Sequence, residues 1–523
     1  MKKKIMSGLL ILVLLIVGIT GCGSQQRSDE TGSSGDEEGQ KTFVFGDTTF
    51  NAENGEPDIN PHNDNSGWAC IRYGVGETLF RFNDEMEMEP WLAESCENVD
   101  EYTWKIVLRE GISFTSGRIM DAEAVKECLE DLVKNHPRAA ENLSIAEITA
   151  EDMTLTIRTS IPVPALINYL ADPYGCIYDV QAGVTEEGIV QGTGPYRAVS
   201  LTTDSEMELV KNENYWNGEP KIDKITVRTI SDGDTLTMAL QSGEIDAAYG
   251  MPYASYPLFE NDNYTFTSCE TSRVFFGAMN FESPVTSDPA VRKAIAMGID
   301  KEGFVETLLG GNGYPAAGVY PDNVSFGGDV VSAESYDPEG AKQVLEEAGW
   351  VDTDGDGIRE KDGTPLVLRW LTYPSRQEQP LLAESAQATL GEIGFQVEIN
   401  NTADHNRIRT DSDAWDIYVS AMVTAPTGDP EYFFNYHCLD SSGNNDGHYH
   451  SDRLEELAQE MAKTFDADKR AELAIQMQQV ILDDNAYVFC SHLRMSMISK
   501  ANVSGLTAHP CDYYEITVDL DIE

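Results

Sequence analysis

Two spacings of apolar residues alternate along this chain. Trp104–Leu108 and Met153–Ile157 place apolar and polar side chains in turn, which predicts strands with one buried face. Asp121–Leu132 instead places its Ala, Val, Cys and Leu side chains on one helical face, with Asp121 as the N-cap. A longer amphipathic helix is predicted over Asp468–Leu482. Both kinds of element are therefore expected throughout the chain.

Strands and helices also follow one another in the order typical of α/β folds. Ile225–Ile230 is a predicted strand, Asp234–Gln241 a predicted helix, and Ile245–Tyr249 the next strand. A second strand, helix and strand are predicted at Leu366–Trp370, Gln377–Leu390 and Phe395–Ile399. Because strands separated by helices usually pair in parallel, the pattern predicts α/β lobes with parallel sheets.

The first 22 residues have a pattern of their own. Three lysines precede an apolar run over Leu9–Val17, and small residues then precede Cys22. This order resembles a bacterial lipoprotein signal peptide, which implies cleavage before Cys22, acylation of its thiol and a lipid anchor on the extracytoplasmic face of a membrane. The alternative is an uncleaved anchor helix, for which the apolar run is short.

Residues 23–41 are predicted to form a disordered tether. Gly23–Gln40 contains no aliphatic or aromatic side chain and is rich in Gly, Ser and acidic residues, so it cannot bury enough surface to become ordered. The apolar pattern resumes at Thr42. The remaining body of about 480 residues, in a chain with 41% hydrophobic residues, is large enough for more than one domain.

Charge narrows the possible partners. The chain has 89 acidic and 36 basic residues, a net charge of −53. Such a surface argues against binding to nucleic acid, whose phosphates require Lys and Arg, and against anionic lipid surfaces. It favours cationic ligands or metal ions, unless the acidity serves only to keep the surface solvated.

Eight cysteines besides Cys22 are scattered along the chain without a CxxC pair. An extracytoplasmic location permits disulfides, but eight cysteines allow 105 connectivities, so none is assigned. Several lie in apolar or helical runs and are expected to be small buried residues, as Cys128 is in AEAVKECLEDL.

Six short segments together resemble the peptide/nickel family (family 5) of extracellular solute-binding proteins of ABC transporters. In chain order they are Glu77–Phe80 with Pro90–Glu94, Tyr102–Phe114, Gly192–Tyr196, Asn214–Trp216, Gly243–Asp246 and Asp288–Ala296. These segments also have purely structural interpretations. GTGPY is typical of a turn, NYW of a buried aromatic cap, and the helix that contains Arg292 of an amphipathic helix of the scaffold. We expect these structural roles for the segments rather than ligand contact.

The resemblance implies an α/β fold of two lobes, the periplasmic-binding-protein clamshell. Lobe I would comprise residues 42–284 and 498–523, with an extra subdomain inserted at about 80–185, and lobe II residues 285–497. Ligand would lie between the lobes, and the closed form would dock on membrane permease subunits. The protein would be a monomer and not an enzyme, without a required cofactor. Consistently, the chain has no GxxxxGK[ST] phosphate loop.

The ligand is the open question. Peptide-binding members pair the ligand's amino terminus with an Asp in W-x-x-D-Y-x-D-P, and Pro426 occupies that position here. Nickel-binding members carry W-G-A-P-Y-D-P, which Ala425–Pro426 and Asp429–Pro430 resemble with one extra residue and no Tyr. The hypothesis is therefore capture of nickel, free or chelated. The alternative is a di- or oligopeptide, and a secreted metallohydrolase is a distant alternative, although no HExxH or GxSxG motif occurs.

Histidines follow this segment. His437, His448 and His450 lie where nickel-binding relatives place a ligand histidine, and imidazole suits nickel(II). The spacing of His448 and His450 puts both rings on one side of an extended segment, while Cys490 and His492 share another strand face. The alternative is that the three loop histidines are merely solvated.

A carboxylate-bearing chelate would also need a cation. Relatives use an Arg after the helix predicted at Pro164–Leu170, but Asp172–Cys176 offers none. Arg273 is the substitute candidate, unless it pairs with an acid. The aromatic side chains of Trp68 and Tyr432 are candidates for walls of the site, whereas the alternation around Trp415 favours core packing.

One acidic loop has metal-ligand spacing. Asp352, Asp354 and Asp356 follow the D-x-D-x-D-G pattern of calcium loops, with Glu360 downstream. The twelfth position, where an EF-hand needs a bidentate acid, is Gly363. The candidates are a structural calcium site and a solvated acidic turn.

Overall fold

A computed structural model describes residues 39–84, 86–376 and 378–523. The predicted signal peptide, Cys22 and nearly all of the tether lie outside these residues. The described elements belong to one compact unit, residues 41–523. No helix in this described part is long and apolar enough to cross a membrane.

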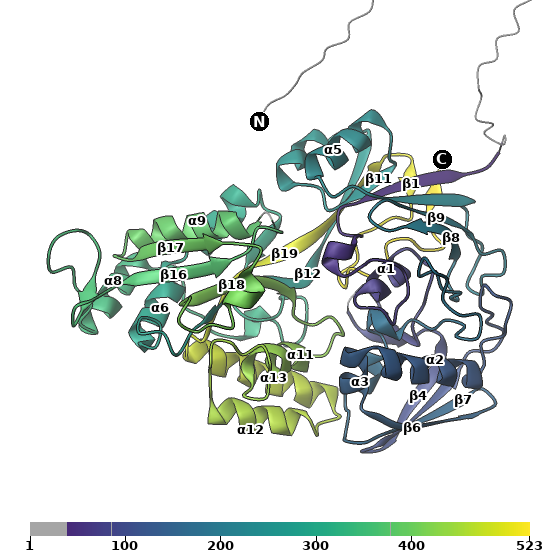
Figure 1. The fold of residues 1–523 in the computed structure, drawn as a ribbon, viewed down its shortest axis with the longest axis horizontal. Helices are drawn as coiled ribbons and strands as arrows, with labels where there is room; N and C mark the ends of the chain where they lie inside the picture. Colours follow the sequence, from purple (N-terminus) through teal and green to yellow (C-terminus); the bar gives the residue numbers. More distant parts are fainter. Residues whose placement is uncertain (1–38, 85, 377) are drawn as a thin grey trace, which may run out of the picture. The chain divides into compact units, whose positions relative to one another are not determined.

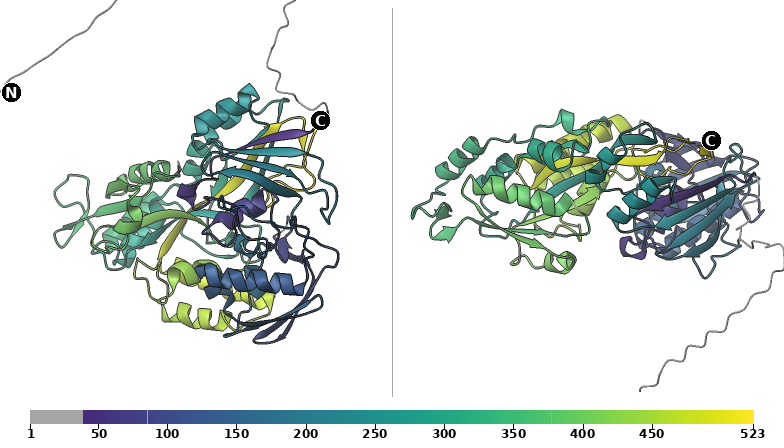
Figure 2. Two further views of the ribbon diagram at one scale, coloured as in Figure 1. Left: turned by 45° about the vertical axis from the view of Figure 1, so that its right-hand side comes forward. Right: turned by 90° about the horizontal axis from the view of Figure 1, so that it is seen from above.

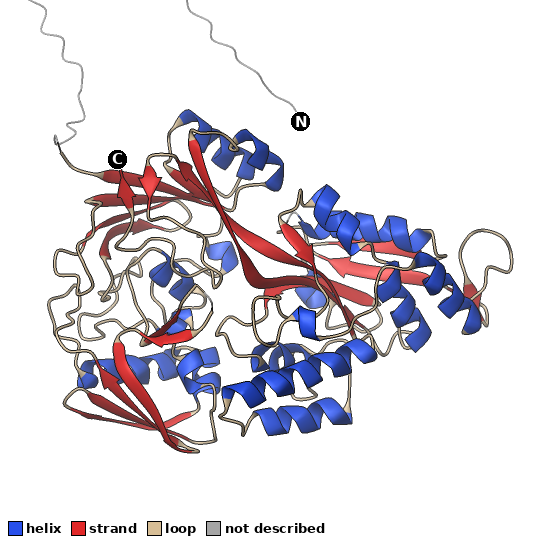
Figure 3. Ribbon diagram, turned by 180° about the vertical axis from the view of Figure 1, so that it is seen from behind, coloured by secondary structure: helices blue, strands red, loops and turns tan. Residues whose placement is uncertain are grey.

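Two long strands organise the unit. β12 (Tyr264–Met279) and β19 (Tyr487–Lys500) pair antiparallel along most of their length, and each also pairs with a different set of strands at one end (Figure 3). They lie at the middle of a sheet of order β17-β16-β18-β12-β19-β11-β1-β10-β9-β8, with β13 paired to β19. The same two strands therefore belong to both lobes, and the boundaries predicted at 284 and 498 lie a few residues beyond β12 and just before the end of β19.

Lobe I is built around β1 (Thr42–Asp47), which lies parallel between β10 (Lys224–Thr229) and β11 (Ala247–Tyr249). β11 joins β19 with Ala247 opposite Ser499. On the side of β10 away from β1, β9 (Glu206–Lys211) pairs antiparallel with β10, and β8 (Tyr196–Thr202) pairs antiparallel with β9. The predicted strand and helix at 225–241 are confirmed as β10 and α5 (Gly233–Ser242), while β11 is shorter than its predicted range (Figure 1).

In lobe II, β18 (Ile417–Val423) pairs antiparallel with β12, and β16 (Val367–Thr372) and β17 (Gln396–Asn401) extend the sheet in parallel. The helix α9 (Glu378–Gly391) connects β16 to β17, so the second predicted strand-helix-strand unit is confirmed. The side chain of Trp415 is 1% exposed and its indole donates to the carbonyl oxygen of Arg409 at 2.9 Å, which confirms core packing for this residue.

Within residues 80–185 a separate sheet forms, of order β4-β5-β7-β6. Its strands are Ala93–Asp100, Thr103–Leu108, Thr154–Thr159 and Ile145–Glu151. All its pairings are antiparallel, so the expectation of parallel sheets holds only for β1, β10, β11, β16, β17 and β18. The reason is that β4–β5 and β6–β7 are joined by tight turns, and a parallel pair needs a longer crossover.

Two helices cover this inserted sheet. α2 (Ala122–Asn135) begins with the predicted cap, because the Asp121 carboxylate accepts from the Ala124 backbone N–H at 2.9 Å. α3 (Pro137–Leu143) follows directly. In Figures 1 and 2 these blue helices lie beside the yellow-green α12 (Asp452–Met461) and α13 (Ala467–Asp483) of lobe II. A direct link between the two regions is the Asn168 amide, which donates to the Thr427 carbonyl oxygen at 2.8 Å.

Three of the six family-like segments meet at one buried carboxylate. Glu77 accepts hydrogen bonds from the Trp91 indole (2.8 Å), the Thr193 hydroxyl (2.8 Å), the Tyr215 hydroxyl (2.8 Å) and the Trp216 indole (3.0 Å). Burial raises the pKa of Glu77, and the four donors act in the opposite direction. The segments around 77, 91, 193 and 215 are thus tied together, in the structural role expected for them.

Replacing this acceptor should destabilise lobe I. Glu77→Ala leaves four donors without their partner, and we expect a loss of about 3 kcal/mol in the free energy of unfolding. Urea denaturation followed by circular dichroism measures it. The control is Glu94→Ala, an exposed acid of a neighbouring segment, which should leave the urea midpoint unchanged. Equal midpoints for the two variants would contradict the role given to Glu77.

Candidate ligand-binding site

A cavity of about 600 Å³ lies where the lobes meet at β12 and β19. Its lining comes from α1 (Ser66–Arg72), the end of β11, the middle of β12 and β19, and the loops before α9 and around Pro510. The charged members of the lining are Glu56, Arg72, Arg273, Arg376, Glu378, Arg494 and Asp512. The cavity is therefore polar and carries both signs of charge.

Arg273 lies on the cavity side of β12 together with Thr271, whereas Glu270 and Ser272 line a different hollow, as the alternation of a strand requires. The pairing of β12 with β19 shifts register between Glu270 and Val274, so the strand also carries a bulge at this point. The bulge is held by neighbouring segments: the Thr271 hydroxyl donates to the Leu493 carbonyl oxygen at 2.9 Å, and Thr424 donates to that of Ser272. Arg273 was predicted as a ligand contact, and the structure places it in the cavity lining.

A second guanidinium shares the cavity with Arg273. Arg376 has no carboxylate within 4.0 Å among the described residues, and the nearest carboxylate oxygen to Arg273 is Asp512 Oδ2 at 3.9 Å. Burial and then the positive charge of Arg376 lower the pKa of Arg273. Two like charges facing one cavity favour an anionic group between them, and carboxylates fit guanidinium geometry best.

An adjoining part of the cavity wall is acidic. Arg72, at the end of α1, lies within 3.3–3.8 Å of carboxylate oxygens of Asp47, Glu56, Asp512 and Glu515. All five side chains are buried. Burial raises the pKa of Glu56 to about 8, against the opposing effect of Arg72. One arginine thus faces four carboxylates, and two of these, Glu56 and Asp512, line the cavity.

The other predicted residues lie in different places. Trp68 lines the cavity and packs edge-on against Tyr513, with ring centroids 5.7 Å apart. Tyr432 instead stacks on Tyr436 at 5.6 Å and is absent from the described lining of the cavity.

The three candidate nickel ligands are also absent from that lining. The ring of His437 is buried among aromatic side chains, and its Nε2 lies 3.1 Å from Met422 Sδ. Burial lowers the pKa of His437 to about 3, so the ring is neutral at physiological pH. His448 is about half exposed with Nε2 3.5 Å from Glu282.

His450 is exposed and its Nδ1 lies 2.9 Å from Asp440, and the hydrogen bond to this carboxylate, followed by its charge, raises the pKa of the ring. The three rings therefore have separate surroundings. Cys490 and His492, the other pair, are buried in β19, where the ring of His492 stacks on Tyr314 and burial lowers its pKa to about 3.

The acidic loop brings its carboxylates together. Ligand oxygens of Asp352, Asp354 and Asp356 lie within 4.8 Å of one another, and all three side chains are exposed. Figure 1 shows this loop between α8 (Pro338–Glu347) and β16, at the end of lobe II away from β12 and β19. A calcium ion there stays a prediction.

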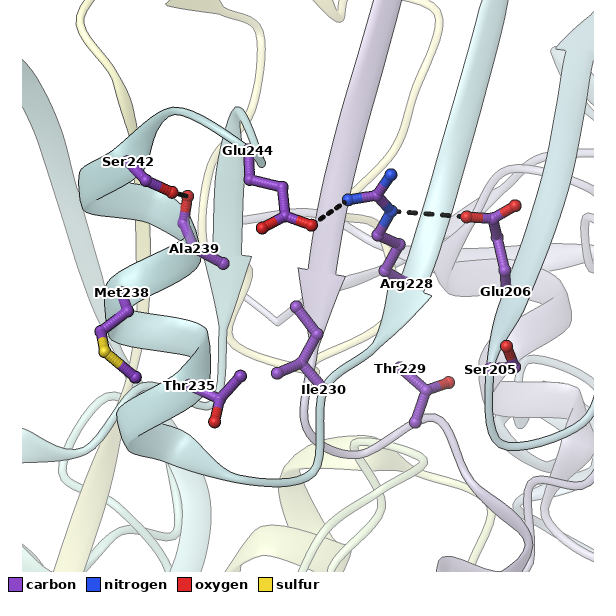
Figure 4. Close-up of a pocket in the computed structure, with 10 residues that line it drawn as sticks. All are labelled: Ser205, Glu206, Arg228, Thr229, Ile230, Thr235, Met238, Ala239, Ser242 and Glu244. Carbon is purple, nitrogen blue, oxygen red and sulfur yellow. Dashed lines mark hydrogen bonds and ion pairs between the residues drawn. The ribbon is translucent and has the colours of Figure 1, made fainter. Parts of the chain in front are cut away.

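Two further hollows differ from this cavity. One of about 610 Å³ lies over α5 and β10 (Figure 4), where Arg228 is already paired with Glu244 at 2.8 Å and Glu206 at 3.4 Å. The other, of about 670 Å³, is lined mainly by apolar side chains such as Met88, Trp104 and Phe465. The described arginines of these two hollows, Arg228 and Arg470, have carboxylate oxygens at 2.6–3.4 Å, whereas Arg273 has its nearest one at 3.9 Å.

Sequence reasoning missed most of the charged lining, including Glu56, Arg72, Arg376 and Asp512. One signal was present: Arg72 interrupts the apolar run WACIRYGV, and a charge within a buried helix needs partners. The cysteines behave as expected. The eight described ones are free thiols, and six of them are buried.

Two-lobed binding proteins have this architecture, and comparison with known proteins identifies the class. Residues 87–445 match the family described as "Bacterial extracellular solute-binding proteins, family 5 Middle". The chain belongs to this family of ABC-transporter solute-binding proteins, which are extracytoplasmic ligand carriers and not enzymes. The metallohydrolase alternative is thereby excluded.

Among relatives, the chain is 28% identical to the nickel-binding protein NikA of Staphylococcus aureus, over 87% of this chain and 90% of that protein. It is 29% identical to the glutathione-binding protein GsiB of Escherichia coli, over 61% and 62%. A crystal structure of a nickel ABC transporter protein from Bacillus halodurans superposes with a TM-score of 0.79 at 31% identity, covering 92% of this chain and all of that one.

The crystal structure of Staphylococcus aureus NikA with Ni(L-His)2 has a TM-score of 0.77 at 25% identity, over the same shares. The two-lobed α/β fold is thus confirmed. These comparisons establish relatedness to both nickel binders and glutathione binders.

The raised pKa of Glu56 predicts a pH-dependent stability. The folded protein holds this proton up to about pH 8 while the unfolded chain releases it near pH 4.5, so rising pH removes stability between these values. Glu56→Gln keeps the neutral shape and lacks this loss. At pH 9 the variant should exceed the wild type by on the order of 1 kcal/mol or more, with near equality at pH 5.

Thermal denaturation at both pH values measures this difference. Glu53→Gln, at an exposed position three residues earlier, serves as control and should follow the wild type at both. A constant difference between Glu56→Gln and wild type across this range would contradict the assignment.

Proposed function

We propose that this chain is a lipid-anchored binding protein that captures nickel, as the ion or a chelate, and delivers it to the permease of an ABC importer. Acylated Cys22 would hold it on the extracytoplasmic face of the membrane, where it would act as a monomer. Ligand bound between the lobes would favour a closed form, and that form would dock on the permease. Nickel is here the cargo, and no resident cofactor is required.

The arginine pair of the cavity carries this proposal. Arg273 and Arg376 present two guanidiniums to one cavity without a close carboxylate partner, which suits a ligand that brings its own carboxylates. Amino-acid chelators of nickel have such groups, and the Staphylococcus aureus relative is described in complex with Ni(L-His)2. Trp68 would form part of the wall.

Short peptides are the alternative cargo. Peptides also end in a carboxylate, and relatives include proteins described as glutathione-binding. Against this stands Pro426 at the position where peptide-binding members have an Asp, since proline offers no charge to an ammonium group. Nickel therefore remains the first hypothesis.

The loop histidines remain candidates for direct ligands of nickel, whereas the two arginines would contact the carboxylates of a chelator. Imidazole suits nickel(II), and the neutral ring of His437 has a lone pair to offer. Metal held by His437, His448 or His450 would lie in the loop over 437–450 and not in the cavity. Variants of the histidines and of the arginines therefore test different sites.

Isothermal titration of the metal-stripped chain from Lys41 onward, with nickel plus L-histidine, tests the proposal. Arg376→Ala should weaken binding about tenfold or more, because it removes a buried partner of the ligand carboxylate. The matched control is Arg228→Ala, whose guanidinium pairs with Glu206 and Glu244 in a different hollow, and it should bind like the wild type.

Further titrations separate the alternatives. Nickel alone, and a di- and tripeptide pool, are tested in the same way. Loss of nickel binding in His448→Ala or His450→Ala, with Arg376→Ala unaffected, would move the metal to the histidine loop. Peptide binding that is indifferent to nickel would contradict the nickel proposal and favour the peptide importer.

The lipid anchor is tested in cells. Cys22→Ser removes the thiol that would be acylated, so the protein should move from the membrane fraction to the soluble or secreted fraction and lose label from radioactive palmitate. Immunoblotting of the fractions measures this. As a control, Cys96→Ser changes a cysteine of the folded body and should leave both readouts as in the wild type. Membrane retention of Cys22→Ser would point to the uncleaved anchor helix.

A further inference from the structure

Three buried thiols lie where α1 meets the inserted subdomain. Cys70 belongs to α1, Cys128 to α2, and Cys176 directly follows the short helix η2 (Pro173–Gly175). Each of the three side chains is at most 1% exposed. None of them belongs to the described lining of the cavity, so ligand binding does not account for them.

Two of these sulfurs face the same point. A Cβ atom added to Gly76 would lie 2.6 Å from Cys70 Sγ and 3.2 Å from Cys176 Sγ. Burial and a hydrogen bond to the Cys70 thiol raise the pKa of Cys176, so the two thiols are in direct contact. Gly76 therefore leaves the space in which the sulfurs meet, and a larger residue would fill it.

The backbones that carry the two cysteines also approach closely. A Cβ atom added to Gly67 in α1 would lie 2.5 Å from the carbonyl oxygen of Pro173 in η2. Cys70 follows Gly67 by three residues, and residues at this spacing share one face of a helix. Cys176 follows Pro173 by three residues as well. A disulfide needs Cα atoms about 4.4–6.8 Å apart, which such backbone contact favours.

Cys128 has different neighbours. Its Sγ lies 3.8 Å from the carbonyl oxygen of Cys176, 3.5 Å from the backbone nitrogen of Tyr178 and 3.9 Å from His62 Nε2. The sulfur thus contacts backbone atoms and an imidazole, whereas the contact between Cys70 and Cys176 joins two thiols. Cys128 is therefore the less suitable partner for either cysteine.

We propose that Cys70 and Cys176 form a disulfide bond once the protein has left the cytoplasm. Proteins of this family are extracytoplasmic, and disulfides persist there. The two thiols lose two electrons and two protons as their S–S bond forms. The oxidant is itself a disulfide, whose S–S bond is reduced to two thiols. The described structure holds the reduced form. The inference goes beyond the proposed function and is independent of the cargo.

Burial determines when the bond forms. The thiolate is the reactive species in thiol–disulfide exchange, and the raised pKa of Cys176 keeps this thiol protonated in the folded protein. Oxidation is therefore expected during folding, before α1 packs against η2. Once the bond has formed, the same burial protects it from external thiols.

The bond would connect the wall of the cavity to the inserted subdomain. Trp68 and Arg72, which line the cavity, lie on α1 on either side of Cys70. The loop closed between residues 70 and 176 contains most of the inserted subdomain. A closed loop of about 100 residues restricts the unfolded chain strongly, so the bond should stabilise the folded protein.

Peptide mapping of the exported full-length protein tests the inference. The protein is denatured in N-ethylmaleimide and digested with trypsin without a reductant. The three thiols then lie on separate peptides, residues 42–72, 127–134 and 159–197. Mass spectrometry should find peptide 42–72 joined to peptide 159–197, and reduction should separate them. Alkylated thiols at both Cys70 and Cys176, or a bond from Cys128 to either, would overturn the assignment.

Thermal denaturation gives a second readout. Wild type refolded with glutathione disulfide should melt about 4 °C above wild type refolded with a phosphine reductant. The double variant Cys70→Ser/Cys176→Ser should melt at one temperature after both treatments. Cys438→Ser, which changes a buried cysteine of lobe II, is the matched control and should keep the difference. Equal melting temperatures of wild type after both treatments would contradict the bond. Because the mapping uses the unmodified protein, it remains decisive even if a variant does not fold.

Discussion

The antiparallel pairing of β12 with β19 is the constraint on which the rest of the structure depends. Both strands take part in the sheets of both lobes, so their register sets which residues of the two lobes face each other. The register shift at 271–273 occurs where the cavity lies. Side chains alternate between the two faces of β12 here, so Thr271 and Arg273 line the cavity and Glu270 and Ser272 line a different hollow. The connection between the lobes and the lining of the cavity thus share one element.

Electrostatics give the cavity its character. Four buried carboxylates surround Arg72, and two guanidiniums face them with only one ion contact within 4.0 Å between the walls. Buried charges are stable only when paired, and here the pairing is complete on neither side. Such incomplete pairing is expected where a ligand supplies the remaining partners. The two guanidiniums also give a chain with a net charge of −53 a local positive region that would suit an anionic group.

Relatedness alone does not select the cargo. The family includes proteins described as nickel-binding and as glutathione-binding, and this chain resembles both at similar identity. Longer coverage favours the nickel binders, and Pro426 offers no charge to the amino terminus of a peptide. The guanidiniums of Arg273 and Arg376 favour a ligand with an anionic group. One scaffold can serve either cargo through changes in a few side chains, because function depends on the site and not on the fold alone.

The sequence by itself determined the local elements and the family. Alternation and capping predicted β10, α5, β16, α9 and β17 because these signals act over a few residues. The family-like segments around Glu77 have a shared structural role, because their side chains donate hydrogen bonds to this one buried carboxylate.

Only the tertiary structure determined which residues form the candidate binding site. Glu56, Arg72, Arg376 and Asp512 are far apart in the chain and carry no local motif, so nothing short of the β12–β19 register and the loop positions could bring them together. The histidines illustrate the converse: their spacing indicated a shared site, but tertiary packing buries His437 and leaves His448 and His450 exposed, because burial depends on neighbours that local spacing does not specify.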